Sequence, residues 1–246
     1  MANGFDPRAS AARPAASPDV GREGVAFDAG LRSYMLSVYN YMASGVLWTG
    51  IVAFALALTG VAQAIWSGGG ILRYLIIFAP LLMVMVMGFR AHRMSTGAMQ
   101  AFFWAFATVM GLSMSVIPLV YTGTSIAATF FATAAAFVSL SLWGYTTKKD
   151  LSGFGTFLIM GVVGLIVASI VNLFIQSDTM STVISFIGVL LFAGLTAYDT
   201  QKIKSVYYQV QGSDMLGKSA ILGALTLYLD FINMFQFLLS FMGSRD

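Results

Sequence analysis

The chain has 246 residues, of which 58% are hydrophobic and only 9% are charged, with a net charge of +3. A soluble domain carries about 25% charged residues, so this chain has too few polar groups to cover a soluble surface. The basic residues are few and dispersed, which excludes the basic patch of a nucleic-acid-binding protein, and no cysteine is present for disulfides or thiolate metal sites. The composition therefore predicts an integral membrane protein that has the lipid bilayer as its solvent and no nucleic-acid partner.

Residues 1–33 differ in composition from the rest of the chain. Three of the five prolines, Pro7, Pro14 and Pro18, lie here among Ala, Ser, Gly, Arg and Asp. No apolar run of signal-peptide length follows the start, and this composition favours disorder. We therefore expect a disordered polar N-terminal tail over residues 1–33 and a transmembrane domain over residues 34–246.

Seven apolar segments follow the tail, each close to the about 20 residues that cross a bilayer as a helix. They are apolar on every side instead of alternating, which favours helices over the strands of a membrane barrel. Short polar or glycine-rich segments separate them, which indicates short loops. We expect an all-α integral membrane protein with seven transmembrane helices at about 41–65, 71–90, 98–119, 124–144, 154–175, 180–199 and 216–242.

The basic residues fall mostly on one side of the predicted membrane. The tail and the loops after helices two, four and six share that side, and together they hold Arg8, Arg13, Arg22, Arg32, Arg90, Arg93, Lys148, Lys149, Lys202, Lys204 and Lys218. The opposite side holds only Arg73 and Arg245. Because cytoplasmic loops carry an excess of Lys and Arg, we expect the N-terminus in the cytoplasm and the C-terminus outside.

Two acidic residues, Asp199 and Asp230, lie in the apolar segments, whereas the other eight lie in the tail, in loops or at the C-terminus. A carboxylate in a membrane helix costs about 2.5–3.5 kcal/mol on insertion scales, and such groups usually face the bundle interior and have a function. Asp230 is deep in the seventh helix. Asp199 lies near the cytoplasmic end of the sixth, one turn from Lys202, so it could also be a simple helix-end charge.

Helices six and seven are consecutive and antiparallel, so we expect them to be neighbours. If the side chains of Asp199 and Asp230 meet, the two carboxyl groups would share a proton and could act as a pH sensor. When deprotonated, the same oxygens suit a hard cation such as calcium. With these bounds, Asp199 lies near the membrane surface and Asp230 lies deep in the membrane. Pairing therefore requires helix six to be longer, or helix seven to start later, than predicted.

Three further polar residues are candidates for supporting roles. Arg90 or Arg93, at the end of helix two, could hold Asp199 in an ion-pair latch, or both could be topology anchors that extend to the membrane surface. Asn233 lies one turn from Asp230 and could orient it, or bond across helices.

Several motifs resemble those of the Bax inhibitor family, also called transmembrane Bax inhibitor motif proteins, and of its bacterial members in particular. The resemblance covers about residues 30–243, and the two aspartate motifs in this order are its most specific part. The motifs are Tyr39-Asn40-Tyr41-Met42, Gly144-Tyr145-Thr146-Thr147-Lys148-Lys149-Asp150-Leu151-Ser152-Gly153, Ala197-Tyr198-Asp199-Thr200-Gln201 and Leu227-Tyr228-Leu229-Asp230-Phe231-Ile232-Asn233.

The resemblance implies a seven-helix fold with the seventh helix central, in a bacterial chain that would reside in the cell inner membrane. It also implies a pH-sensitive calcium leak, with Asp199 and Asp230 as sensor and gate. Calcium would be the permeant ion, held transiently by the two aspartates, and no cofactor is expected. In some relatives an arginine of helix two is associated with the sensor, which here falls on Arg90 or Arg93.

Two other functions remain open at this point. A regulator that binds other membrane proteins and moves no ion would have the same composition. An intramembrane aspartyl protease also places aspartates on helices six and seven, one of them after a tyrosine, as in Tyr198-Asp199. Its second aspartate follows a Gly-x-Gly pattern, however, whereas Leu227-Tyr228-Leu229 precedes Asp230 here, and its Pro-Ala-Leu motif is missing. These departures count against an enzyme.

Overall fold

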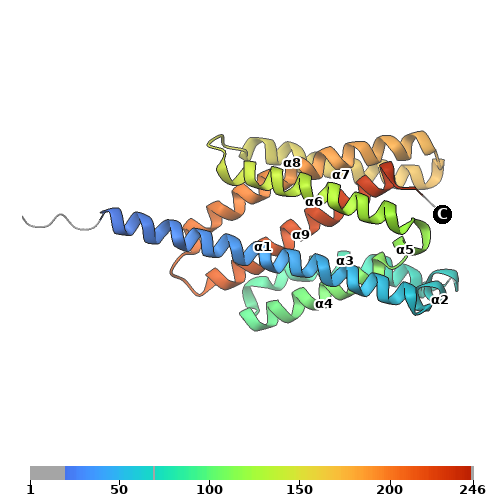
Figure 1. Cartoon of the computed structure of the whole chain (residues 1–246), viewed down its shortest axis with the longest axis horizontal. Coiled ribbons are helices and arrows are strands. Elements are labelled where there is room, and N and C mark those ends of the chain that lie inside the picture. Colours follow the sequence, from blue (N-terminus) through green and yellow to red (C-terminus); the bar gives the residue numbers. More distant parts are fainter. Residues whose placement is uncertain (1–19, 69, 245–246) are drawn as a thin grey trace, which may run out of the picture.

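The computed structural model describes residues 20–68 and 70–244, and this part of the chain forms a helical bundle (Figure 1). Seven of its helices are long and apolar enough to cross a membrane, which confirms the predicted all-α class with seven transmembrane helices. The elements are α1 (Val20–Leu58), α2 (Val61–Ser67), α3 (Ile71–Arg90), η1 (Ala91–Arg93), α4 (Thr96–Met114), α5 (Ile117–Val120), α6 (Gly123–Thr146), α7 (Ser152–Ile175), α8 (Asp178–Val210) and α9 (Met215–Met242).

The first helix begins earlier than the sequence predicts. α1 starts at Val20, so residues 20–33 of the predicted tail are helical, while residues 1–19 lie outside the described part of the chain. Its 39 residues give a length of about 58 Å, roughly twice the thickness of a bilayer's hydrocarbon core. The tail-side part of α1 therefore extends beyond the membrane.

Two predicted spans are interrupted by residues that do not continue a helix. The predicted first span breaks at Gly60, whose φ of 75° is left-handed, so α1 ends and the short α2 follows. The predicted third span is divided into α4 and α5 just before Pro118, which lies in the first turn of α5. In both places the chain stays on the side of the bundle opposite the N-terminal tail, so the order of crossings is unchanged.

The seventh spanning helix, α9, is the centre of the bundle, as predicted. It packs against α8, α1, α6 and α4. In its most apolar stretch of 18 residues, 61% of the residues are buried inside the bundle, whereas the share is 33% or less in the other spans. Tyr228 on α9 is fully buried among the rings of Phe103 and Phe106. Its hydroxyl bonds to Thr49 of α1 at 2.6 Å. Because α9 contacts four other helices, a shift of α9 affects most of the bundle.

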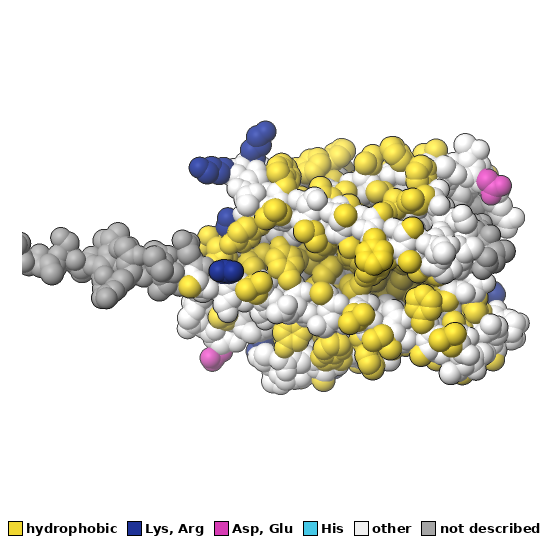
Figure 2. Space-filling view, in the orientation of Figure 1, with side chains coloured by type: hydrophobic (Ala, Val, Ile, Leu, Met, Phe, Trp, Pro, Cys, Tyr) yellow, Lys and Arg dark blue, Asp and Glu magenta, His cyan; other side chains and the backbone are white. Residues whose placement is uncertain are grey.

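The outer surface matches a membrane environment. α3 packs chiefly on α4, and α7 packs chiefly on α8, so both lie at the periphery. Figure 2 shows hydrophobic side chains along the middle of the bundle and Lys and Arg side chains at the end where α1 begins. α9 ends on the opposite side of the bundle (Figure 1). The apolar middle and charged end are what a bilayer requires of the surface.

A glycine allows α6 and α8 to approach closely. A Cβ added at Gly144 would collide with the backbone carbonyl of Ala197 on α8. Small residues at such contacts let membrane helices pack backbone to backbone. This contact fixes α8 against α6 two residues before Asp199.

Replacing Gly144 by alanine is expected to destabilise the bundle by about 1–3 kcal/mol, because neither backbone can move without disturbing the α6–α8 contact. Thermal unfolding of the purified protein in detergent measures this. Gly164 on α7 is the matched control, since a Cβ there meets no atom within 4 Å. Gly164→Ala should leave the melting temperature unchanged or slightly raised. Equal melting temperatures for the two variants would contradict the close α6–α8 contact.

Candidate functional site

The structure brings Asp199 and Asp230 together inside the bundle. Asp199 on α8 is 8% exposed and Asp230 on α9 is 4% exposed. Their carboxyl groups lie within hydrogen-bonding reach of each other. The two residues that the sequence singled out as a pair are therefore neighbours.

The length of α8 explains how the two aspartates reach the same depth, and it meets the condition that helix six be longer than its apolar run. α8 ends at Val210, eleven residues past Asp199 and well beyond the predicted end at 199. Asp230 lies fifteen residues after the start of α9 at Met215. Along the helix axes these separations are about 16 and 22 Å, and a four-residue connection containing left-handed Gly212 joins the two helices. Asp199 is thus an interior residue, not a helix-end charge.

The surroundings of the pair contain few groups that could neutralise it. Lys202, one turn along α8, is the positive charge that acts on Asp199. Within the described residues, Oδ2 of Asp230 has no hydrogen-bond partner although it is buried. Two carboxylates in contact away from water cannot both be ionised without strong repulsion. The arrangement is therefore suited to holding one proton between the two groups.

The three supporting residues do not lie where the sequence suggested. Arg90 and Arg93 are exposed at the end of α3 and in η1, and the positive charge that acts on Asp199 is Lys202, not either arginine. α3 packs chiefly on α4, which does not bring it to the aspartates. Asn233 donates from Nδ2 to the carbonyl of Leu229, one turn back on the same helix, at 2.8 Å. Its amide therefore bonds to the backbone of its own helix, and the described residues include no hydrogen bond between Asn233 and Asp230.

Two polar residues that the sequence did not single out anchor α8 just past the aspartate. The side chain of Gln201 donates to the carbonyl of Lys149 at 2.8 Å and accepts from the amide of Leu151 at 2.9 Å. Lys204 donates to the carbonyl of Tyr145 at 2.9 Å, and its ammonium lies 4.8 Å from the centre of that ring. These bonds join α8 to the end of α6 and to the loop that follows it. The sequence contained this signal, because Gln201 and the partners Tyr145, Lys149 and Leu151 all lie in the motifs that resemble the family.

A chain of hydroxyl groups also joins α8 to α6 and α1, next to Asp199 in the sequence. Thr200 donates to the carbonyl of Thr196 at 2.7 Å, so the hydroxyl of Ser141, at 2.8 Å, must donate to Thr200. Tyr39 then donates to Ser141 at 2.6 Å. The chain crosses from α1 through α6 to α8 and ends beside Asp199. A sequence alone cannot identify it, because serine and threonine are common in membrane helices.

The site does not have the ligands of a resident metal centre. Calcium takes six to eight oxygen ligands, and no group of three or more His, Cys, Asp or Glu side chains occurs in the described part of the chain. Two carboxyl groups could contact a cation only briefly, as it passes. A calcium ion at this site would therefore be cargo and not a resident cofactor.

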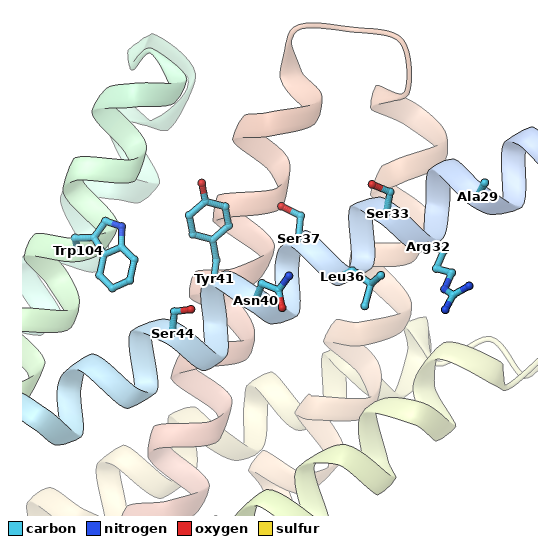
Figure 3. Close-up of a pocket in the computed structure, with 9 residues that line it drawn as sticks. All are labelled: Ala29, Arg32, Ser33, Leu36, Ser37, Asn40, Tyr41, Ser44 and Trp104. Atoms are coloured by element: carbon cyan, nitrogen blue, oxygen red, sulfur yellow. The ribbon is translucent and has the colours of Figure 1, made fainter.

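A polar groove lies apart from the aspartates, along the tail-side half of α1 (Figure 3). Its volume is about 620 Å³. The lining includes Arg32, Ser33, Ser37, Asn40 and Ser44 of α1, and Trp104 of α4. Neither aspartate contributes to it, so the groove is a separate feature of the surface.

Comparison with known proteins identifies the family. Residues 31–246 match the family described as inhibitor of apoptosis-promoting Bax1. An uncharacterized protein of Caulobacter vibrioides is 46% identical over 233 residues, which cover 91% of this chain and 93% of that protein. The inner membrane protein YbhL of Escherichia coli K12 is 43% identical over 219 residues, which cover 88% of this chain and 94% of YbhL. The chain therefore belongs to the Bax inhibitor family of membrane proteins.

Proposed function

We propose that this protein is a pH-sensitive calcium leak channel of the inner membrane, gated by Asp199 and Asp230. The observation that carries the proposal is the contact between these two buried carboxyl groups at the junction of α8 and α9. Intramembrane carboxyl groups are costly and usually mark an ion or proton pathway. A leak moves calcium down its gradient, so the protein needs no resident cofactor.

Proton exchange at the pair supplies the gating force. With one shared proton, the carboxyl groups attract each other and hold α8 against α9. With that proton removed, the two charges repel in a low-dielectric site and loosen the contact. The freed oxygens are the ligands that a passing calcium ion prefers. A local change of charge thereby biases two arrangements of the central helix.

We also propose that the N-terminus faces the cytoplasm and the C-terminus faces the outside. Arg90, Lys148 and Lys204 all belong to the end of the bundle from which α1 starts, whereas Arg73 lies at the other end. The positive-inside rule places the basic end in the cytoplasm. The aspartate pair then closes the pathway from the cytoplasmic side.

The packing of α9 favours a channel over an aspartyl protease. Leu227 and Tyr228, which precede Asp230, are fully buried. They leave no free backbone on which a peptide substrate could lie beside the aspartate. A regulator that binds other membrane proteins without moving ions remains the alternative, and ion flux separates it from the channel.

Calcium entry into liposomes that contain the purified protein and an internal indicator dye tests the channel. Between pH about 6 and about 8, the range that a coupled carboxylate pair reaches, the wild-type leak should change with pH. Asp199→Asn and Asp230→Asn should each flatten that dependence, because neither variant can exchange the shared proton. Asp178→Asn is the matched control, since Asp178 is an exposed aspartate at the other end of α8. It should behave as the wild type does.

Two results would contradict the proposal. Flux no greater than in empty liposomes at every pH would exclude the channel and favour the regulator. A pH dependence that survives in Asp199→Asn and Asp230→Asn would remove the aspartates from the gate while leaving a leak in place.

Single cysteines test the orientation, because the native chain has none. Ser213→Cys marks the loop between α8 and α9, and Ser67→Cys marks the end of α2 on the opposite side. In intact cells a membrane-impermeant thiol reagent should label Cys at position 67 and spare position 213 until the inner membrane is opened. The reverse pattern would show that the basic end faces outward.

A further inference from the structure

An apolar pocket of about 440 Å³ lies in the half of the bundle away from the N-terminal tail. α1 packs mainly on α4 and α9, and α6 packs mainly on α8 and α9, so α1 and α6 both rest on the central helix. In Figure 1, α9 runs between α1 and α6. Residues of α1, α6 and α9 line the pocket, together with Met114 of α4 and residues of α5. The lining residues Ile51 of α1 and Phe131 of α6 are exposed on the outer surface. Because both helices are membrane spans, the pocket opens toward the bilayer.

The pocket offers an occupant no polar partner among the side chains that line it. Phe231, Ile232 and Phe235 of α9 form its inner wall. The single polar side chain in the lining is Thr49, whose hydroxyl already donates to the carbonyl of Ala107 and accepts from Tyr228. Water needs two or more polar partners in a cavity, and a charged headgroup would be buried without compensation. Only a hydrocarbon occupant fits this chemistry.

The wall also lacks side chains at two positions where there is room for them. A Cβ added at Gly50 of α1 or at Gly123 of α6 would meet no atom within 4 Å. Both glycines line the pocket. The space is thus open at the level of the helix backbones, which gives an unbranched chain access to the inner wall.

We propose that this pocket binds one acyl chain of a membrane phospholipid, which enters between α1 and α6 and lies against Phe231 and Phe235. The headgroup of the lipid stays at the membrane surface. The volume lies within the about 300–1,000 Å³ of small-molecule pockets. The occupant comes from the bilayer because the opening lies within the membrane spans. This site is independent of calcium flux, and it would exist in a regulator as well as in a channel.

Crosslinking of a lipid acyl chain to the buried inner wall of the pocket tests the proposal. Phe231 and Phe235 are 4% and 6% exposed and belong to the central helix, so lipid at the outer surface cannot reach them. The full-length protein is reconstituted in phosphatidylcholine vesicles that contain a phosphatidylcholine with a diazirine in the middle of one acyl chain. After illumination, mass spectrometry of peptides locates the adducts. We expect adducts on the segment of α9 that contains Phe231 and Phe235.

Filling the pocket should remove these adducts. Gly50→Trp places a ring in the open space of the wall and should lower labelling of α9 at least several-fold. Gly164→Trp is the control, because Gly164 is exposed on α7 and its Cβ also meets no atom. It should leave labelling of α9 unchanged. Gly50→Leu, a smaller change that is tolerated more readily in folding, should also lower the labelling.

The proposal is overturned if adducts occur only on outward side chains, such as those of α7, with none on α9. It is also overturned if α9 is labelled equally in the wild type, Gly50→Leu and Gly50→Trp. Both outcomes can be read whether or not the protein conducts calcium, so they do not depend on the proposed leak.

Discussion

The carboxyl groups of Asp199 and Asp230 meet between α8 and α9, shielded from both water and lipid. Burying two acidic groups in contact is unfavourable unless they share a proton, and in the proposed gate the charge on this pair sets how tightly the two helices associate. α9 is the most buried helix in the described bundle and contacts α1, α4, α6 and α8. A change in the pair is therefore transmitted to the packing of most of the molecule.

α8 is also held by contacts with α6 and with the loop between α6 and α7. Gln201 and Lys204 bond to backbone carbonyls near the loop between α6 and α7, and Ser141 bonds to Thr200. The close contact at Gly144 leaves no room for α8 to move toward α6. Repulsion within the pair would therefore act on α9 more than on α8. In the proposed gate, the α8–α9 contact is therefore the one that changes.

Hydrophobicity was sufficient to predict the class, the seven spans and the central pair, because charged residues are rare enough in lipid for Asp199 and Asp230 to be conspicuous. The predicted end of helix six at residue 199 was too early, because the helix continues past the apolar run. Residues 201–210 mix polar and apolar side chains and are helical, and the side chains of Gln201 and Lys204 bond to the carbonyls of Lys149 and Tyr145 on neighbouring elements. The latch from Arg90 or Arg93 and the orienting role of Asn233 are not found either, since helix packing and local backbone bonds decide where those side chains lie.

The protonation state of the pair is the most direct test of a shared proton. Infrared spectroscopy of the protein in lipid, recorded across pH about 6 to about 8, distinguishes the carbonyl band of a protonated carboxyl group from the bands of a carboxylate. The wild type should have a protonated carboxyl band that titrates in this range, and Asp199→Asn and Asp230→Asn should each abolish or shift it. No such band at any pH, or one that is unchanged in both variants, would show that the two aspartates do not share a proton.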